Sequence, residues 1–402
     1  MDQRTHGEAT HDPPPLWVDL AETLFLAAAV VYVLLAVSAV LNPSRDPQDF
    51  GAFYESAAAW RSGGDPYARS GAALLSPNLN PPLFAVLFSP IASLTIREGL
   101  FLWWAVNIAS LGAALAIIGR ELSWRPSRRM ILFGIAFAGT QAQLSQSQLS
   151  WICLLLATLS WRAWRREHSV LAGFWMGALI GLKPIFLPVL GVAILRDKRP
   201  LLLTALGVIL LSVLLGALAC GWSAYASWLQ AGGSVQWFAA FLNASVRGVL
   251  ARLFANDSVT GSIWVLASLS VAAVAVWQLT RHPSSPDQDL AVGFLTSLLV
   301  SPLGWVYYIP VALGPLLATL RGVQRRWWMY LGLAGLCWPL GVGWPSLDKQ
   351  LEPGLWNGCI GSLYAAGLFT LWCLSLQGVR QPAADPNSEP LGTPEARAVP
   401  AR

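Results

Sequence analysis

Residues 42–82, NPSRDPQDFGAFYESAAAWRSGGDPYARSGAALLSPNLNPP, are the main polar interruption in a chain that is otherwise strongly apolar. They follow a first hydrophobic run at about 21–41 and are rich in acids, aromatics, glycines and prolines. An apolar stripe recurs here at helical spacing, formed by Phe50, Phe53, Tyr54, Ala57 and Trp60. The spacing predicts a short amphipathic helix lying on a membrane surface. Asp49 falls at its N-terminal end, where free amides favour a carboxylate, so Asp49 is either a helix cap or a catalytic base.

The composition identifies lipid as the main solvent of the chain. Of 402 residues, 55% are hydrophobic and only 12% are charged, and the mean hydropathy is +0.53. A soluble protein has about 25% charged residues. We therefore expect an all-α polytopic membrane protein. The net charge of +5 comes from short basic clusters between apolar runs, which indicates orientation bias in membrane insertion and not a nucleic-acid-binding face.

About 12 membrane crossings follow from the lengths of the apolar runs, because one span needs about 20 residues. Two stretches, 130–164 and 170–195, are predicted to be hairpins, broken by the polar tract 141–148 and by Lys183-Pro184 respectively. The run at 82–94 is too short to cross and is predicted to be re-entrant or interfacial. A polar-aromatic loop is predicted at 220–260. Single spans are predicted at about 21–41, 99–119, 201–219, 261–280, 290–303, 306–320, 327–343 and 355–376.

The basic clusters orient these crossings. They gather between the predicted spans, as at 120–129 and 162–166, and such clusters stay on the cytoplasmic side. Both chain ends are then cytoplasmic, and 1–19 and 379–402 are predicted to be disordered tails. Between them, 20–378 is predicted to be one domain embedded in the cell (inner or plasma) membrane. Its first extracytoplasmic loop, about 42–98, carries juxtamembrane helices.

Polar residues on the predicted outer face are candidates for chemistry. Lys183 sits at a buried hairpin tip, where an ammonium group needs an anionic partner, either a nearby carboxylate or a lipid phosphate. Arg247 and Arg252 are candidates for the same phosphate, because guanidinium groups bind phosphate bidentately, or they simply flank a loop helix in water. The histidines lie in the N-terminal tail or on the cytoplasmic side: His6, His11, His168 and His282. Neither a metal cluster nor a histidine base is therefore expected on the outer face. We also expect no cofactor.

Several segments resemble, in order, glycosyltransferase family 87 of the GT-C superfamily. The stretches DFGAFYESAAAWRSGGDPY at 49–67 and NPPLFAVLFSPIASL at 80–94 are similar to the family's first lumenal loop. SQSQLSWICLLL at 145–156 resembles its GQxN hairpin, with Gln148 in place of the asparagine. The remaining motifs resemble its Lys-Pro segment, its Asn-x-Ser loop and its Ser-Pro-x-x-Trp motif: GALIGLKPIFLPVLGVAIL at 177–195, FLNASVRGVLARLF at 241–254 and SPLGWVYY at 301–308.

The resemblance implies a GT-C-type fold and a membrane enzyme. Such an enzyme moves a sugar, mannose above all, from a polyprenyl-phosphate donor to a hydroxyl of a lipid or glycan acceptor on the extracytoplasmic face. In that scheme Asp49 is the base of an inverting transfer, and the donor phosphate is held by Lys183, Arg247 and Arg252. Family members often have histidine just after the tryptophan, where this chain has tyrosines. The residues implied in substrate contact are Tyr54, Tyr67, Asn80, Gln146, Gln148, Asn243, Trp305, Tyr307 and Tyr308.

Two other classes of membrane protein fit parts of the pattern. A transporter or flippase of a lipid-linked glycan also has many spans and buried basic residues, but it should show related halves and functional charges near mid-membrane. An O-antigen ligase or polymerase also uses lipid-linked sugars, but it depends on a large late periplasmic loop. In this chain the largest loop comes first, and the polar motifs gather on one face.

Overall fold

The computed structural model describes residues 16–41, 48–68, 77–282, 284–321, 327–338 and 353–377. Within these ranges every regular element is an α-helix or a 3-10 helix, and β pairing is confined to an isolated bridge between Asn243 and Trp305. The predicted all-α class is therefore confirmed. Most of the first predicted tail and all of the second lie outside the described residues.

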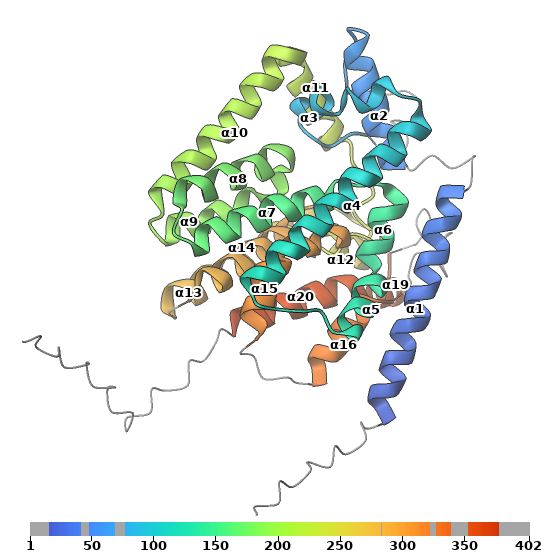
Figure 1. Ribbon diagram of the computed structural model, residues 1–402, viewed down its shortest axis with the longest axis vertical. Coiled ribbons are helices and arrows are strands. Elements are labelled where there is room, and N and C mark those ends of the chain that lie inside the picture. Colours follow the sequence, from blue (N-terminus) through green and yellow to red (C-terminus); the bar gives the residue numbers. More distant parts are fainter. Residues whose placement is uncertain are drawn as a thin grey trace, which may run out of the picture.

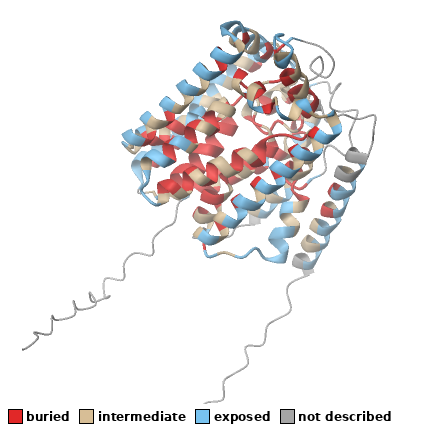
Figure 2. Cartoon of the chain, turned by 45° about the horizontal axis from the view of Figure 1, so that its top comes forward, coloured by how far each residue is buried: buried red, intermediate tan, exposed pale blue. Residues whose placement is uncertain are grey.

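Three helices of the described part are long and apolar enough to cross a membrane: α4 (Ile96–Glu121), α10 (Arg199–Cys220) and α13 (Asp257–Arg281). At 1.5 Å per residue each is about 30 Å long or more. A further long helix, α1 (Leu16–Leu41), runs along the edge of the bundle (Figure 1). Outer helices expose apolar side chains such as Leu210 and Leu266, while buried residues fill the centre (Figure 2). The other predicted crossings are shorter or broken helices, so the total of about 12 stays a prediction.

The first predicted hairpin is present and turns at its polar tract. Its two arms meet at 147–149, where Ser147 has a left-handed φ of 52°. Short side chains that bond locally reach this conformation more easily than bulky ones. The first arm is itself broken at Phe137, which the sequence analysis did not predict. The hairpin consists of α5 (Arg128–Ala136), α6 (Ala138–Gln146) and α7 (Ser150–Arg165).

The second predicted hairpin is broken at Lys183. Pro184 disfavours helical backbone at the residue before it, and Lys183 accordingly has φ −139° and ψ 89°. An ion pair of 2.9 Å between Glu167 and Lys198 joins the two ends of the segment, so the chain does return. The hairpin consists of α8 (Ser169–Leu182), η3 (Pro184–Val189) and α9 (Leu190–Leu195).

The first loop forms the predicted helix, α2 (Gln48–Arg61), but its apolar stripe faces protein. Phe50 and Phe53 pack edge-on against Phe88 and Phe84 of α3 (Pro82–Phe88), at 5.8 and 5.0 Å between ring centroids. The buried part of the stripe is therefore covered by α3 and not by lipid, and the position of α2 at a membrane surface stays a prediction. With η2 (Ile91–Ser93), α3 confirms that 82–94 is too short to cross.

The segment 220–260 is more ordered than the predicted loop. It contains α11 (Trp222–Gly233) and α12 (Val246–Leu253), the latter begun by the Ser245 side chain, which accepts a hydrogen bond from the Gly248 amide. Such a cap satisfies one of the free amides of a helix start.

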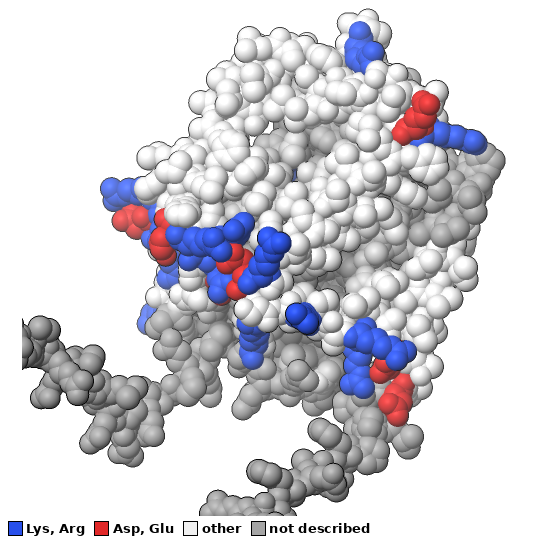
Figure 3. Space-filling view, in the orientation of Figure 1, with Lys and Arg blue, Asp and Glu red and all other residues white. Residues whose placement is uncertain are grey.

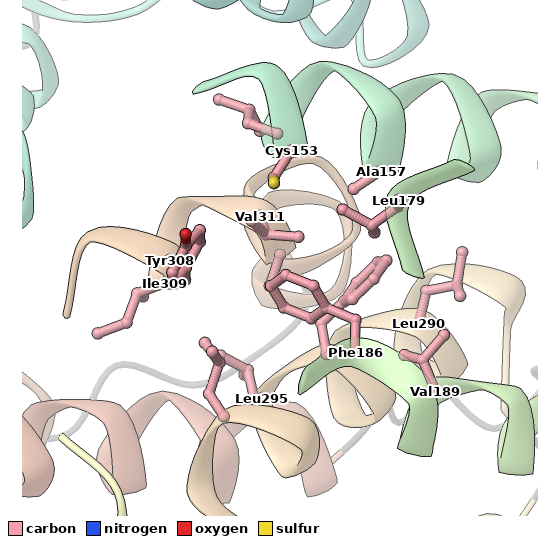
Figure 4. Close-up of a cluster of buried hydrophobic side chains, with 14 of the residues drawn as sticks. Cys153, Ala157, Leu179, Phe186, Val189, Leu290, Leu295, Tyr308, Ile309 and Val311 are labelled. Carbon is pink, nitrogen blue, oxygen red and sulfur yellow. The ribbon is translucent and has the colours of Figure 1, made fainter. Parts of the chain in front are cut away.

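The C-terminal part surrounds α14 (Pro286–Val300), which is buried along nearly its whole length. Figure 4 shows α14 residues Leu290 and Leu295 in one apolar cluster with Phe186 and Tyr308. The predicted span at 327–343 is described only to 338. The other elements of this part are η4 (Val306–Ala312), α15 (Leu313–Leu320), α16 (Trp327–Gly335), α19 (Leu355–Ile360) and α20 (Leu363–Leu376).

Charged side chains gather in patches separated by broad uncharged surface (Figure 3). The arginines predicted to be cytoplasmic pair across different helices, as in Arg162 with Glu121 at 2.9 Å and Arg196 with Asp289 at 2.8 Å. Segments far apart in sequence thus meet through these ion pairs, while the side of the membrane on which they lie stays a prediction.

Candidate active site

Four segments bring polar side chains together around Asp49, near the start of α2. The Gln148 side-chain amide, from the turn between α6 and α7, donates to Asp49 Oδ2 at 2.5 Å. The Tyr308 hydroxyl, from η4, donates to Gln148 Oε1 at 3.1 Å. The Lys183 ammonium, from the break after α8, lies 5.3 Å from the centre of the Tyr308 ring. A carboxylate, an amide, a phenol and a cation therefore form one continuous chain of contacts, which we call the Asp49 cluster.

The Asp49 cluster combines burial with charge. Gln148 and Lys183 are 5% and 8% exposed, and Tyr308 is fully buried. Asp49 is half-buried and interacts electrostatically with Lys183, Tyr307 and Tyr308. Opposite charges interact more strongly when water is excluded. The arrangement offers a carboxylate that can accept a proton beside a cation that can neutralise an anion.

Gln143 fixes the turn that presents Gln148. Its side chain is 2% exposed and donates to the Gln148 carbonyl and, at 3.3 Å, to Asn107 Oδ1. Its own oxygen accepts from the Ser150 amide at 3.2 Å and from the Ser150 hydroxyl. Both ends of this amide are therefore used, and the turn is held to α4 and α7.

Two tryptophans of α4 complete the support of the turn. Trp103 donates to the Ser147 carbonyl and Trp104 to the Ser147 hydroxyl, each at 2.7 Å. The sequence analysis did not identify these residues, Asn107 or Gln143 as parts of a site. A usable signal was present for Asn107, since a polar side chain inside a membrane-length apolar helix such as α4 needs a polar partner.

Aromatic rings form one wall of the Asp49 cluster. Tyr308 meets Phe186 edge-on at 5.9 Å, while Tyr307 stacks on Trp305 at 6.0 Å. Trp305 in turn stacks on Trp237 at 6.0 Å. Tyr307 and Tyr308, which stand where members of the resembled family often have histidine, thus line this wall.

Arg252 is occupied by the backbone of its own loop. Its guanidinium group donates to the carbonyls of Ala239, Ala240 and Asn243 and to the Ser362 hydroxyl. Burial lowers the pKa of Arg252 to about 9, so the group is still charged at neutral pH. This geometry holds α12 against the segment before it and does not bring Arg252 to the Asp49 cluster.

Arg247 keeps part of its hydrogen-bonding capacity. One terminal nitrogen pairs with Asp257 at 2.5 Å, and the group lies 4.8 Å from the Phe238 ring. The other terminal nitrogen is buried and has no hydrogen-bond partner among the described residues. An unpaired buried guanidinium nitrogen is costly, which favours an anionic ligand.

Asn243 joins two of the segments that the sequence analysis singled out. Its amide donates to the carbonyls of Phe238 and Pro302 at 2.9 Å, and its oxygen accepts from the amides of Ser245 and Gly304. Its side chain therefore makes four hydrogen bonds, which is its ordinary capacity. Asn243 fastens the Asn-x-Ser loop to the Ser-Pro segment that precedes Trp305.

The remaining predicted substrate residues lie along the first loop or at the hairpin tip. The Tyr54 hydroxyl donates to the Leu94 carbonyl at 2.7 Å, and the Tyr67 hydroxyl donates to the Asn80 carbonyl at 2.5 Å. Gln146 ends α6 and is half-buried. Among the described residues no three His, Cys, Asp or Glu side chains gather in a group that could hold a metal ion.

Comparison with known proteins gives a family and two curated relatives. The model of glycosyltransferase family 87 matches residues 78–302, more than half of the chain. A polyprenol-phosphate-mannose-dependent alpha-(1-2)-phosphatidylinositol mannoside mannosyltransferase of Mycobacterium tuberculosis (strain ATCC 25618 / H37Rv) is 27% identical over 270 residues, 61% of this chain and 62% of the relative. A protein of the same description from Mycolicibacterium smegmatis (strain ATCC 700084 / mc(2)155) is 29% identical over 143 residues, 32% of each chain. The matches thus span less than two thirds of these relatives' length. No solved structure matches the chain significantly.

Proposed function

The chain belongs to glycosyltransferase family 87, and from this membership we propose that it transfers mannose from a polyprenyl-phosphate donor to a hydroxyl of a lipid or glycan acceptor. The donor follows the printed description of both curated relatives, which use polyprenol-phosphate-mannose. Apolar helices of membrane length support a multi-pass membrane protein. We place both termini in the cytoplasm and the Asp49 cluster on the other side, because the basic clusters favour that orientation.

One observation carries the proposed mechanism: the contact chain from Asp49 through Gln148 and Tyr308 to Lys183. In this mechanism Asp49 takes the proton of the acceptor hydroxyl as its oxygen attacks the anomeric carbon of the sugar. The bond from that carbon to the phosphate oxygen breaks, and polyprenyl phosphate leaves from the opposite face, so the anomeric configuration inverts. The Gln148 amide orients Asp49 through Oδ2.

Lys183 is suited to the departing phosphate. Its ammonium group is buried beside an aromatic face, and such a group needs an anion close by. Negative charge grows on the phosphate as the glycosidic bond breaks, so a fixed cation lowers the barrier. We assign the second phosphate contact to Arg247, whose buried nitrogen has unmet capacity, and assign Arg252 to stabilising α12.

The test uses purified protein in lipid nanodiscs with a panel of polyprenyl-phosphate sugars and a mannoside acceptor. We expect transfer from the mannose donor, with inversion seen by NMR of the product. Asp49→Asn should lower kcat by about 10²- to 10⁴-fold, the range of a general base, while donor binding persists. Glu55→Gln on the same helix is the matched control, because six residues of helix turn Glu55 away from Asp49.

Two results would count against the proposal. Turnover of Asp49→Asn close to that of Glu55→Gln would remove Asp49 as the base. Absence of transfer from every donor in the panel would remove the reaction itself and reopen the transporter interpretation.

A further inference from the structure

The helix α11 buries Ala224 and Ala231 against the protein and exposes large apolar side chains. Trp222 and Leu229 on its outer side are each 65% exposed. Large apolar side chains that face outward are typical of a helix in contact with lipid. A cavity of about 420 Å³ lies beside α11. It is lined by residues of α11 at spacings of three and four and by two residues that follow α2: Ser227, Gln230, Ala231, Ser234, Asp65 and Tyr67.

The lining of this cavity favours a neutral ligand rich in hydroxyl groups. It offers one carboxylate, two hydroxyls, one primary amide and an aromatic ring, and no lysine or arginine is among the lining residues. A phosphate site needs cationic or backbone donors, which are not what these side chains supply. Carboxylate and amide groups pair instead with the hydroxyls of a sugar, which both donate and accept.

The Asp65 carboxylate is held in a fixed orientation at the cavity wall. Its Oδ1 accepts from the Tyr67 amide at 2.9 Å, and its Oδ2 accepts from the Ser227 hydroxyl at 2.8 Å. A carboxylate accepts about four hydrogen bonds, so two positions remain for ligand hydroxyls. A fixed carboxylate binds such hydroxyls without loss of its own rotational freedom.

A second observation lies behind the wall formed by Tyr67. The Tyr67 hydroxyl donates to the Asn80 carbonyl, and the Asn80 side chain donates to Asn78 Oδ1 at 2.9 Å. Asn78 Nδ2 and Asn80 Oδ1 are buried and have no hydrogen-bond partner among the described residues. Neither asparagine is among the residues that line the cavity, so the pair supports Tyr67 from behind and does not itself contact a ligand there.

We propose that this cavity binds a neutral carbohydrate unit of the acceptor, remote from the hydroxyl that reacts. Asp65 follows the C-terminal end of α2, whereas Asp49 is near its N-terminal end. At 1.5 Å per residue, the helix from Asp49 to Arg61 alone measures about 18 Å. The acceptor is then an oligosaccharide chain long enough to reach both places. Its role as acceptor rests on the proposed function, while its binding does not.

The test compares Gln230→Ala with the matched control Ser223→Ala, an exposed change on the same helix that leaves the cavity lining intact. In nanodiscs, KM for an octyl mannotetraoside should rise about fivefold to tenfold in Gln230→Ala, as expected for one lost hydrogen bond. The kcat value, and KM for octyl mannoside, should stay unchanged. Titration calorimetry of free mannotetraose with the Asp49→Asn background should show the same weakening of Kd.

The outcomes separate the two proposals. Transfer to the tetraoside with equal KM in both variants overturns the cavity as a subsite and leaves the proposed function standing. Calorimetric binding that depends on Gln230, without transfer from any donor, keeps the carbohydrate site and overturns the proposed function. No binding of mannotetraose by the Asp49→Asn protein overturns the carbohydrate site.

Discussion

Removal of the Gln148 side chain is the sharpest test of the Asp49 cluster. Gln148→Ala deletes the amide that donates to Asp49 at 2.5 Å and the oxygen that accepts from Tyr308 at 3.1 Å. A hydrogen bond to a charged group contributes about 1.5 to 3 kcal/mol. If that contribution orients the base in the transition state, its loss lowers kcat about 10- to 150-fold, at tenfold per 1.36 kcal/mol.

The assay measures initial rates in nanodiscs at saturating donor and acceptor, together with thermal unfolding of each variant. Gln141→Ala is the matched control, because Gln141 is a half-buried glutamine of α6 outside the Asp49 cluster. Gln148→Asn keeps the amide but is shorter by one carbon–carbon bond, about 1.5 Å. It can hold Asp49 or Tyr308 but not both, so its kcat should fall between those of the wild type and Gln148→Ala.

Two outcomes would refute this reasoning. A kcat of Gln148→Ala within twofold of Gln141→Ala, at unchanged unfolding temperature, would mean that Asp49 needs no amide to orient it. A loss of kcat that follows loss of folded protein would assign Gln148 to the stability of the turn and not to the reaction.

Three further predictions concern neighbouring contacts. Tyr308→Phe removes the hydroxyl but keeps the ring beside Lys183. We expect kcat to fall about tenfold and the Kd for the donor, measured by calorimetry, to stay the same. A changed Kd with constant kcat would contradict this prediction. Asp289→Asn breaks the ion pair with Arg196, in which the Asp289 carboxylate is 4% exposed. Its loss should lower the free energy of unfolding by about 3 to 5 kcal/mol, measured by denaturant titration. A loss below about 1 kcal/mol would show that water reaches the pair. Asn243→Ala removes four hydrogen bonds and should lower the free energy of unfolding by about 2 to 4 kcal/mol. An unchanged unfolding curve would mean that other contacts hold the Ser-Pro segment.

The parts of the fold that depend on local sequence could be predicted. Pro184 breaks α8 at Lys183 because a proline constrains the residue before it. The polar tract around Gln148 breaks the other hairpin for a similarly local reason. The helix α11 was missed because aromatic and small residues in 220–260 hide the helical period. The helix α12 was predicted only as one alternative, a loop helix flanked by Arg247 and Arg252, because caps such as Ser245 are common outside helices as well.

The contacts of the candidate site could not be predicted from sequence alone. Asp49 and Gln148 are 99 positions apart, and only the packing of α2 near the turn after α6 brings them together. The two arginines of α12 look alike in sequence, yet Arg252 binds backbone carbonyls and Arg247 keeps an unpaired nitrogen. The difference depends on where the preceding loop directs its carbonyl groups, which a charge pattern does not contain.

The two departures from the resembled family pattern touch each other. Gln148 stands where that pattern has asparagine, tyrosines stand where it often has histidine, and the Tyr308 hydroxyl bonds to Gln148. Under the proposed function, we expect the longer amide and the phenol to act together in orienting Asp49. Side chains in contact give non-additive mutational effects, usually by 0.5 to 3 kcal/mol. In a double-mutant cycle of kcat, Gln148→Asn and Tyr308→His should each lower kcat alone and lower it less than additively together. Tyr307→His should instead add independently to Gln148→Asn. Additivity in both cycles would show that Gln148 and Tyr308 act independently of each other.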